Sequence, residues 1–277
     1  MSYVSSSAPQ YPHDKLTWVE RLAIGIGRRI NRPGIIRSIC VWWGKVFTCA
    51  VLKRVTGHRW VHIHAEPLHD VPSNRPILIV SNHRTFFDMY VGITALRYLS
   101  KYRIGAPAVF PVRAPFFYDS ILGIWINLLF SGGCMWPPVF RDDRKKELNA
   151  VTKEMMKELL QQDGVCFGYH PEGRRSKSSD PYTLDPPKRG VGELLQGARE
   201  DLVIIPLFIS GLSGNVKKEW HYRKKTYSKS APIRFYWGEP KLANEFSGNS
   251  EEIAEQIHVL IQSLGNEAKQ AEVHIEE

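Results

Sequence analysis

A histidine and an aspartate stand close together in the segment SNHRTFFD, residues 81–88, directly after the apolar run ILIV. The run predicts a buried strand, and residues 86–100 predict a helix. His83 would lie just outside this helix and Asp88 in its first turn, so the bend can bring the two side chains together. A carboxylate bonded to one imidazole nitrogen fixes the tautomer and leaves the other nitrogen to act as a base. A second interpretation stays open: Thr85 and Asp88 match a capping box, in which Asp88 serves only the helix N-terminus.

A second polar loop, GYHPEGRRSK at residues 168–177, follows the apolar segment GVCF. Arg174, Arg175 and Ser176 form a compact group of donors, and Gly173 allows the backbone to approach a ligand closely. Two guanidiniums can bind a phosphate in bidentate geometry. As a run of charge alone, the same residues would more often form a solvated turn.

The elements that position these loops alternate between strands and helices. This order predicts an α/β domain over residues 59–264 with a central, mostly parallel sheet flanked by helices, followed by a frayed tail at 265–277. Active residues in such sheets usually lie on loops just past the strand C-termini, which is where His83 and Gly173 fall. The expected strands cover 60–68, 75–82, 106–112, 134–141, 164–170, 202–210 and 232–240, and the expected helices cover 86–100, 115–130, 144–161, 190–199 and 249–264.

In two of the expected strands, individual residues indicate where the strand lies in the sheet or which side of it faces solvent. Pro137 and Pro138 indicate that the strand at 134–141 lies at an edge or a bulge. Arg141 ends that strand and could direct a further guanidinium at the same anion, although alone it is a surface arginine. His62 and His64 fall on the polar side of the alternating strand at 60–68, which favours a solvated strand face over a metal site.

The composition fits one large domain and favours an anionic partner. Of 277 residues, 43% are hydrophobic, and 37 Lys and Arg against 28 Asp and Glu give a formal net charge of +9. Such a surplus favours nucleic acid, an anionic membrane surface or a phosphorylated substrate, without choosing among them. No nucleic-acid partner is expected, because no helix-turn-helix, RNP-type strand or zinc finger is found. The four cysteines, Cys40, Cys49, Cys134 and Cys166, lack CxxC spacing and predict reduced thiols and no metal site.

The N-terminal part predicts membrane contact. Residues 1–14 are polar and rich in Pro and Ser, which predicts a disordered tail and no secretory signal. Residues 15–58 predict two amphipathic helices, at 15–31 and 35–55. The apolar stretch 38–52 is interrupted by Lys45 and falls short of the ~18 uninterrupted residues of a spanning helix, so it favours an interfacial helix or, alternatively, core packing. The segment KKEWHYRKK, residues 217–225, suits lipid headgroups or a solvated loop.

Together these segments resemble the glycerolipid acyltransferase family of the lysophosphatidate acyltransferase type. NHRTFFD resembles the family's His-x4-Asp signature, PVFR its second block, PEGRRS its Pro-Glu-Gly-Thr-Arg-Ser block, and LVIIPLFIS its fourth block around a proline, here Pro206. The four occur in the family's order, and the resemblance covers about 75–240. It implies that His83 and Asp88 are catalytic, and that capping by Asp88 is compatible with this role. It implies substrate binding by Arg141, Glu172, Gly173, Arg174, Arg175 and Ser176.

Two residues depart from the family pattern. Arg174 replaces the usual threonine, and His170 replaces the usual phenylalanine before Pro-Glu-Gly. Both departures bear on the identity of the acceptor rather than on the reaction. Glu172 would contact a glycerol hydroxyl of the acceptor or, alternatively, pair with a neighbouring arginine. Lys188 and Arg189 could add to the anion site.

The resemblance implies transfer of a fatty acyl group from acyl-CoA or acyl carrier protein to the hydroxyl of a lysophospholipid, first of all lysophosphatidate, giving phosphatidate. His83 would take the hydroxyl proton, which is typically worth about 10²–10⁴-fold in rate, and no metal or cofactor beyond the acyl donor is expected. Backbone N–H groups near His83 or Gly173 are candidate donors to the oxyanion. No Gly-x-Ser-x-Gly segment is found, which favours direct transfer over an acyl-enzyme.

Because both substrates are amphiphiles, the implied location is the surface of a membrane, as a peripheral or monotopic protein on the cytoplasmic face. Three other interpretations stay open. The same chemistry could act on another acceptor: a lyso-aminolipid, another lysophospholipid or glycerol phosphate. The chain could be a catalytically silent membrane-binding homologue, against which the presence of both His83 and Asp88 argues. It could also be a soluble thioesterase.

Overall fold

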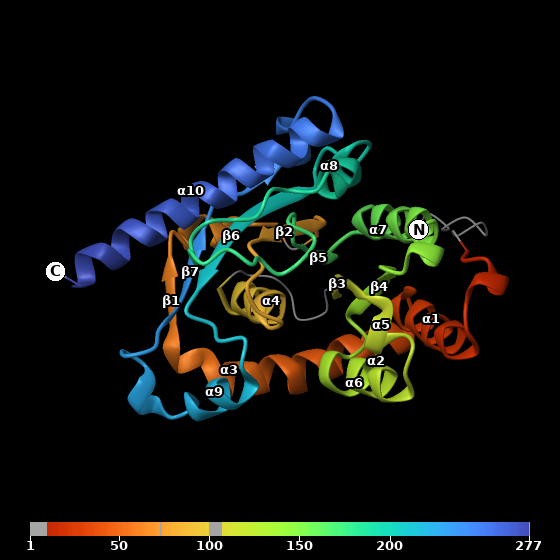
Figure 1. Cartoon of the computed structure of the whole chain (residues 1–277), viewed down its shortest axis with the longest axis horizontal. Coiled ribbons are helices and arrows are strands. Elements are labelled where there is room, and N and C mark those ends of the chain that lie inside the picture. The colour runs from red at the N-terminus through yellow and green to blue at the C-terminus, as the bar shows by residue number, and fades with distance from the viewer. Residues whose placement is uncertain (1–9, 73, 100–106, 277) are drawn as a thin grey trace.

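The structure of the chain is a computed structural model that describes residues 10–72, 74–99 and 107–276. Within these residues, an eight-stranded sheet runs through the molecule in the order β1-β7-β6-β2-β5-β3-β4, and the short strand β8 pairs with β6 (Figure 1). The strands are β1 (Trp60–Ile63), β2 (Ile77–Ser81), β3 (Ala108–Arg113), β4 (Met135–Val139), β5 (Cys166–Tyr169), β6 (Val203–Ser210), β7 (Ile233–Trp237) and β8 (Lys241–Leu242).

The sheet is mostly parallel, as predicted. β2 lies at its centre between β5 and β6 and runs parallel to both, while β7 and β8 run antiparallel to β6. Every residue of β2 is buried, which explains the unbroken apolar run ILIV, because a strand covered on both faces has no polar side. β4 lies at the edge and its pairing with β3 shifts register after Phe110, in agreement with the edge or bulge that Pro137 and Pro138 predict.

Helices cover both faces of this sheet. α10 and α8 pack on one face, and α4 packs against β2, β5 and β6 from the other (Figure 1). The helices are α1 (Trp18–Asn31), α2 (Ile35–Trp43), α3 (Ala50–Thr56), α4 (Asp88–Leu99), α5 (Ala114–Phe117), α6 (Ile121–Ser131), α7 (Leu148–Leu160), α8 (Gly190–Leu195), α9 (Val216–His221) and α10 (Ser250–Glu276).

A long apolar helix lies along the outside of the domain. α2, a π-helical segment (Gly44–Cys49), α3 and a short 3-10 segment follow one another without a break over Ile35–Arg59, so the apolar character continues past Lys45. By length and composition this helix could cross a membrane, and only 6% of its most apolar window is buried. Core packing of residues 38–52 is therefore wrong. Trp43 Nε1 donates a hydrogen bond to the Leu129 carbonyl of α6 at 2.7 Å, which fixes the helix beside α6.

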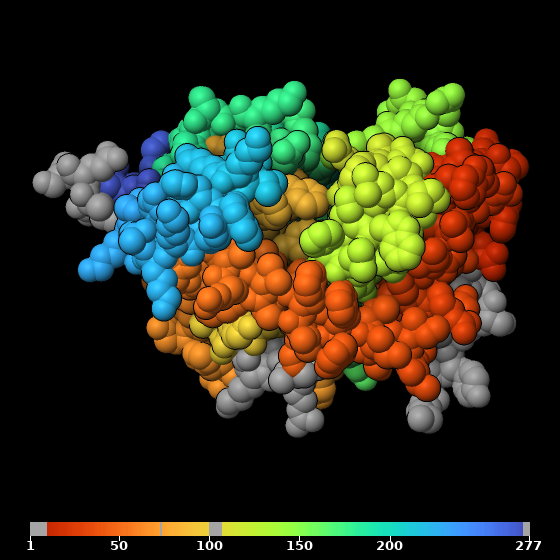
Figure 2. Space-filling model, turned by 90° about the horizontal axis from the view of Figure 1, so that it is seen from below, coloured from red at the N-terminus to blue at the C-terminus, as the bar shows by residue number. Residues whose placement is uncertain are grey.

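α6 presents a second apolar surface next to this helix. Its exposed side chains are Ile121, Leu122, Trp125, Leu129 and Phe130, and those of the long helix include Ile35, Ile39, Trp42, Val46 and Val51. In the space-filling view of Figure 2, the orange long helix and the yellow-green α6 segment lie on the same face of the molecule. An exposed apolar surface of this extent indicates contact with a membrane or a protein partner.

The two ends of the chain differ from the predicted tails. Residues 1–9 and 277 lie outside the described residues. Tyr11, inside the predicted disordered tail, is buried, and its hydroxyl hydrogen-bonds to Thr152 Oγ1 of α7 at 2.8 Å. The predicted frayed tail at 265–277 is also wrong for residues 265–276, because α10 continues through them and Ala268 remains buried against the domain.

Two elements inside the domain also differ from the prediction. The apolar helix expected at 115–130 is divided into α5 and α6, and Phe116, inside α5, has a φ of 77°. At Val61 and His62 of β1 the alternation is reversed, because Val61 is exposed while His62 stacks on Phe235 with ring centroids 4.9 Å apart, whereas His64 is exposed as predicted. Burial lowers the pKa of His62 to about 4, so it is a neutral aromatic side chain in the sheet rather than a solvated one.

Candidate active site

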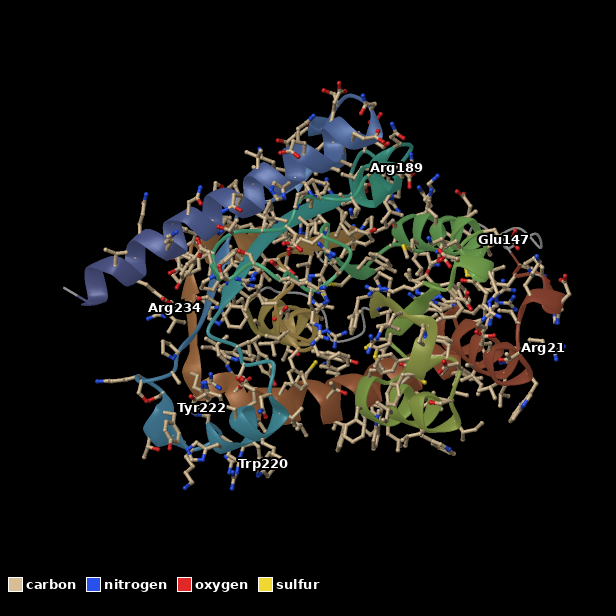
Figure 3. All side chains as sticks on the ribbon, viewed as in Figure 1. Arg21, Glu147, Arg189, Trp220, Tyr222 and Arg234 are labelled. Carbon is tan, nitrogen blue, oxygen red and sulfur yellow. The ribbon has the colours of Figure 1, made fainter. Side chains whose placement is uncertain are left out.

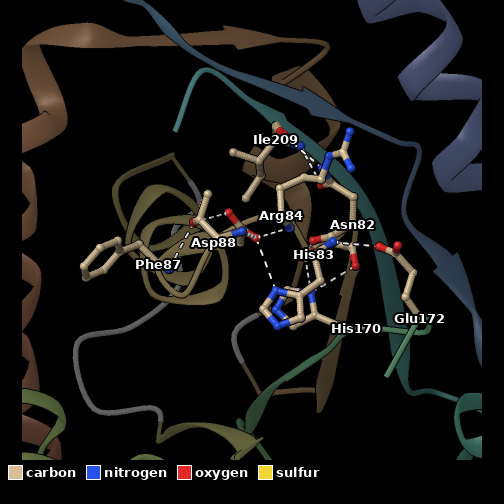
Figure 4. Close-up of polar contacts among 10 residues, drawn as sticks. Asn82, His83, Arg84, Phe87, Asp88, His170, Glu172 and Ile209 are labelled. Carbon is tan, nitrogen blue, oxygen red and sulfur yellow. Dashed lines mark hydrogen bonds and ion pairs between the residues drawn. The ribbon is translucent and has the colours of Figure 1, made fainter. Parts of the chain in front are cut away.

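His83 and Asp88 meet at the carboxyl end of the central strand β2. The chain leaves β2 at Ser81, bends through the next residues and starts α4 at Asp88. His83 Nδ1 lies 3.3 Å from Asp88 Oδ2 (Figure 4). The bend thus makes the contact that a continuous helix would not, because residues five apart point in different directions on a helix. The two predicted catalytic residues form a histidine–carboxylate pair, with Nε2 on the opposite side of the ring.

Asp88 also serves the start of α4. Its Oδ2 accepts hydrogen bonds from the backbone N–H groups of Arg84 and Thr85, both at 2.7 Å, and its Oδ1 accepts one from Thr85 Oγ1 at 2.6 Å. The carboxylate is only 1% exposed. The contact with His83 and the cap of α4 are therefore both made by one side chain: the hydrogen bonds that fix the helix start also fix the carboxylate beside His83.

A second histidine lies flat against His83. The ring of His170, at the end of β5, is stacked on the ring of His83 with centroids 4.0 Å apart and planes 5° from parallel. Its Nδ1 lies 3.1 Å from the Ser81 carbonyl, which can only accept, so Nδ1 carries the proton. Burial, reinforced by the neighbouring His83, lowers the pKa of His170 to about 3. His170 is thus a neutral ring that restricts how His83 can turn.

Glu172 joins the two polar loops. Its Oε1 accepts a hydrogen bond from the backbone N–H of His83 at 2.8 Å, and its Oε2 accepts one from the N–H of Asp185 at 2.9 Å. Burial raises the pKa of this carboxyl, and only 1% of Glu172 is exposed. Among the described residues Glu172 forms no ion pair with an arginine, so that predicted contact is wrong. The substrate-binding role stays a prediction, and what the structure gives Glu172 is the task of holding the backbone of His83.

Further hydrogen bonds fix the same loop from other directions. The Asn82 side chain donates to the Ile209 carbonyl at 2.9 Å and accepts from the Ile209 N–H at 2.8 Å, which ties the loop to β6. The backbone N–H of Ser176 donates to the His83 carbonyl at 2.8 Å, and its hydroxyl donates to Asp185 Oδ1 at 3.1 Å. Ser176, one of the predicted binding residues, therefore supports the site through its backbone.

Two of the candidate backbone donors for an oxyanion, the N–H groups of His83 and Gly173, already have partners. The N–H of His83 bonds to Glu172, and the N–H of Gly173 bonds to the His170 carbonyl at 3.0 Å. Gly173 has a φ of +68°, in the left-handed region that glycine adopts without strain. The glycine is therefore needed for the turn, and a backbone donor to a developing oxyanion would have to be another N–H group of these two loops.

A cavity of about 350 Å³ opens in front of His83. Among the predicted binding residues, Arg141, Gly173 and Arg175 line it. Arg141 Nη2 donates to the Gly173 carbonyl at 2.9 Å, which holds its guanidinium beside the loop. Arg174 does not line the cavity: its Nη2 lies 3.3 Å from Asp185 Oδ2. The two adjacent arginines thus have different surroundings.

The rest of the cavity wall is largely apolar. It is made by Phe86, Met89, Phe110, Pro111, Val112, Phe117 and Val139, from the start of α4, from β3 and β4 and from α5. Sequence reasoning missed these residues, because they come from segments far apart in the chain. It also missed Arg113, at the end of β3, which adds a third guanidinium to the wall. The signal for Arg113 was its place at the carboxyl end of a predicted strand.

Arg84, inside the His-x4-Asp segment, was also missed. Its guanidinium donates to the Ser178 carbonyl at 3.0 Å and also to the Asp180 carbonyl. It therefore points away from the cavity and fastens the loop after Glu172 to the loop after β2. Its side chain stabilises the arrangement of the two loops.

The fold and the site together define an α/β protein with a histidine–carboxylate pair facing a cavity that has cationic and apolar walls. Residues 62–210 match the family model described as Acyltransferase. The match covers more than half of the chain, so the chain belongs to the Acyltransferase family, and the predicted family is confirmed.

Comparison with solved structures supports the same fold. The crystal structure of the 1-acyl-sn-glycerophosphate (LPA) acyltransferase, PlsC, from Thermotoga maritima resembles this chain with a TM-score of 0.50. The two are 18% identical, and the alignment covers 84% of this chain and 80% of that one. This likeness confirms the predicted α/β architecture. No curated protein matches the sequence.

Proposed function

We propose that the chain transfers a fatty acyl group from a thioester donor, acyl-CoA or acyl carrier protein, to the hydroxyl of a lysophospholipid, with lysophosphatidate as the acceptor that suits the site best. The observation that carries this proposal is the position of the His83–Asp88 pair beside a cavity whose wall has both guanidiniums and apolar side chains. A lysophosphatidate carries one phosphate and one chain, and the wall offers a complement to each.

In this mechanism His83 Nε2 removes the proton of the acceptor hydroxyl as the oxygen attacks the thioester carbonyl. Asp88, held by Arg84 and Thr85 N–H groups, keeps Nδ1 protonated and stabilises the imidazolium that forms. The tetrahedral intermediate then collapses, the carbon–sulfur bond breaks, and the leaving thiolate takes the proton from Nε2. Arg113, Arg141 or Arg175 would bind the phosphate or the oxyanion, and neither a metal nor a cofactor takes part.

The surroundings of Arg174 favour an ordinary phosphate acceptor over an unusual one. Arg174 was the departure that pointed to other headgroups, but its guanidinium pairs with Asp185 outside the cavity. The apolar surface of the long helix and α6 supports contact with a membrane, and we place the chain there as a peripheral or monotopic protein on the cytoplasmic face. Figure 2 shows a hollow between the blue and yellow-green segments on this same face.

The test is release of free thiol from palmitoyl-CoA by the full chain, with and without lysophosphatidate. We expect release that depends on the acceptor and that falls by at least about 10²-fold in His83→Ala. His69→Ala, which removes an exposed histidine outside the cavity, is the matched control and should retain activity. Release without any acceptor would instead indicate a thioesterase, and silence with every lysolipid would indicate a protein that only binds membranes.

A further inference from the structure

A second groove, of about 740 Å³, lies between α3 and α9 and shares no lining residue with the His83 cavity. Its wall combines basic and aromatic side chains and contains no carboxylate. The lining residues with these properties are Lys53, Arg54, His58, Tyr98, Trp220, Arg223, Lys224 and Lys225. The segment predicted to suit either headgroups or solvent, residues 217–225, is therefore one wall of a formed groove.

The charge of this region is not balanced from within. No Asp or Glu occurs between Arg21 and Ala65, and Glu219 is the one acidic residue between Leu202 and Gly238. Glu219 is itself neutralised, because its Oε2 lies 2.7 Å from Arg59 Nη1 in a buried ion pair. Among the described residues, the cations of the groove form no ion pair, so they concentrate positive potential that an external anion would neutralise.

The groove is held open by buried contacts. Arg59 is fully buried, and its guanidinium bonds to Glu219 and also to the carbonyls of Gly211 and Ala231 at 3.1 and 2.5 Å. Glu219 Oε1 in turn accepts the Ser213 N–H at 2.6 Å. These bonds attach the short helix α9 to the sheet, so the basic residues that follow it have a fixed place rather than lying on a loose loop.

Aromatic rings position the cations at the surface. Lys53 Nζ lies 4.2 Å from the ring centroid of Trp60 and 5.0 Å from that of Tyr98, and the Arg223 guanidinium lies 4.5 Å from that of Trp220. Trp220 is 58% exposed and is labelled at the lower edge of the molecule in Figure 3. An exposed tryptophan beside basic residues is typical of a protein surface at the level of lipid headgroups.

The position of the groove favours a bilayer over a soluble partner. In Figure 2 the blue α9 segment lies on the same face as the exposed apolar long helix and α6. We propose that the groove between α3 and α9 binds the phosphate headgroup of an anionic phospholipid in the bilayer, as a second lipid site separate from the acceptor site at His83. The site docks the enzyme on anionic membranes and takes no part in the reaction.

The test is sedimentation of the full chain with vesicles of phosphatidylcholine alone or with phosphatidylglycerol added. The groove variant is Arg223→Gln/Lys224→Gln/Lys225→Gln. Each basic residue at an anionic surface contributes roughly five-fold, so the variant should lose about a hundred-fold of its partition onto the anionic vesicles, while its weaker partition onto phosphatidylcholine is unchanged. The matched control is Arg144→Gln/Lys146→Gln/Lys157→Gln, which removes the same charge from the segment around α7, away from α9 in Figure 1, and should lose less than about three-fold.

Vesicle binding is measured without turnover, so the result does not depend on the proposed reaction. A urea-unfolding curve that matches the wild type shows that the groove variant is folded. Equal losses in the two triple variants would overturn the proposal in favour of diffuse charge attraction. It would also be overturned if the groove variant bound anionic vesicles normally but turned over acyl carrier protein thioesters poorly, since the groove would then dock the acidic donor protein.

Discussion

The imidazole rings of His83 and His170 lie in parallel planes with centroids 4.0 Å apart, and only His83 reaches a carboxylate. His170 bonds to the Ser81 carbonyl, and burial lowers its pKa to about 3. The two histidines are therefore not equivalent: His170 stays neutral over the pH range in which acyl transfer would be measured. We infer that it positions the ring of His83 and does not compete for the proton.

This arrangement predicts that His170 makes the free energy of unfolding depend on pH. Below pH 6.5 the unfolded chain binds a proton at this residue, whereas the folded chain binds it only near pH 3, so His170 makes folding less favourable as the pH falls. His170→Phe keeps a planar ring and removes the proton site. Its free energy of unfolding should fall less between pH 7 and pH 4.5 than that of the wild type, by up to about 2 kcal/mol. Urea unfolding at the two pH values measures the difference, and His69→Phe is the exposed control. Identical pH slopes for all three proteins would contradict the prediction.

Asp88 has two roles that substitutions can separate. Asp88→Asn removes the charge that stabilises the His83 imidazolium, so kcat should fall by about 10²–10⁴-fold with a small change in KM. Thr85→Val removes a hydrogen bond to the same carboxylate without touching His83, and should cost about 1 kcal/mol of stability with activity within ten-fold. Steady-state kinetics and urea unfolding of both variants test this. Equal losses of activity would mean that Asp88 only caps α4.

The adjacent arginines should differ in their effect on substrate binding. Arg175→Gln or Arg141→Gln removes a guanidinium from the cavity wall and should raise the KM for lysophosphatidate by about 10- to 100-fold, as expected for a charge-assisted hydrogen bond. Arg174→Gln removes the same charge outside the wall and should change KM less than about three-fold. Monoacylglycerol, which has no phosphate, should show no difference among the three variants. A larger effect at Arg174 would place the phosphate elsewhere.

Glu172 should matter through the backbone of His83. In Glu172→Gln one side-chain oxygen still accepts a backbone N–H, but an NH₂ group faces the second N–H and cannot accept from it. The variant should therefore lose about 1–3 kcal/mol of unfolding free energy, and its kcat should also fall. Because the pKa of Glu172 is raised, the wild type loses part of its stability as the pH rises from about 4 through that pKa, and the variant should not. Urea-unfolding curves across this pH range measure the difference between the wild type and the variant, and Glu200→Gln is the exposed control. Unchanged stability would show that the two N–H groups find other partners.

The contact between His83 and Asp88 and the loops could be predicted from the sequence because their signals are local. An apolar run followed by a polar bend and a helix start places His83 and Asp88 within a few residues of each other, and no other part of the chain has to be known. The same is true of the order of strands and helices. What the sequence could not give is which loops meet: the bonds from Glu172 to His83 and from Asn82 to Ile209 join segments that are far apart in the chain.

The sequence also cannot show that two neighbouring residues of the same type have different surroundings in the fold. Arg174 and Arg175 follow Gly173, whose positive φ sets where each side chain points, and no pattern of residue types reports that angle. The reversed alternation of β1 has a related cause, since His62 packs on rings of β7, which lies at the far end of the chain. The start of α9, in contrast, is indicated by a local residue: the Asn215 side chain accepts hydrogen bonds from the N–H groups of Lys217 and Lys218 and caps the helix.

The exposed apolar helices lie on one face, and if the chain rests on a membrane by that face, as proposed, this orientation determines which acceptor concentration sets the rate. A protein resting on a bilayer by that face meets acceptor molecules that diffuse in two dimensions beneath it. Its rate then follows the mole fraction of lysolipid in the membrane rather than the amount in the whole volume. Inert lipid added at constant total substrate would dilute the surface and slow the reaction, so the membrane acts as the solvent of this reaction and its composition sets the effective substrate supply.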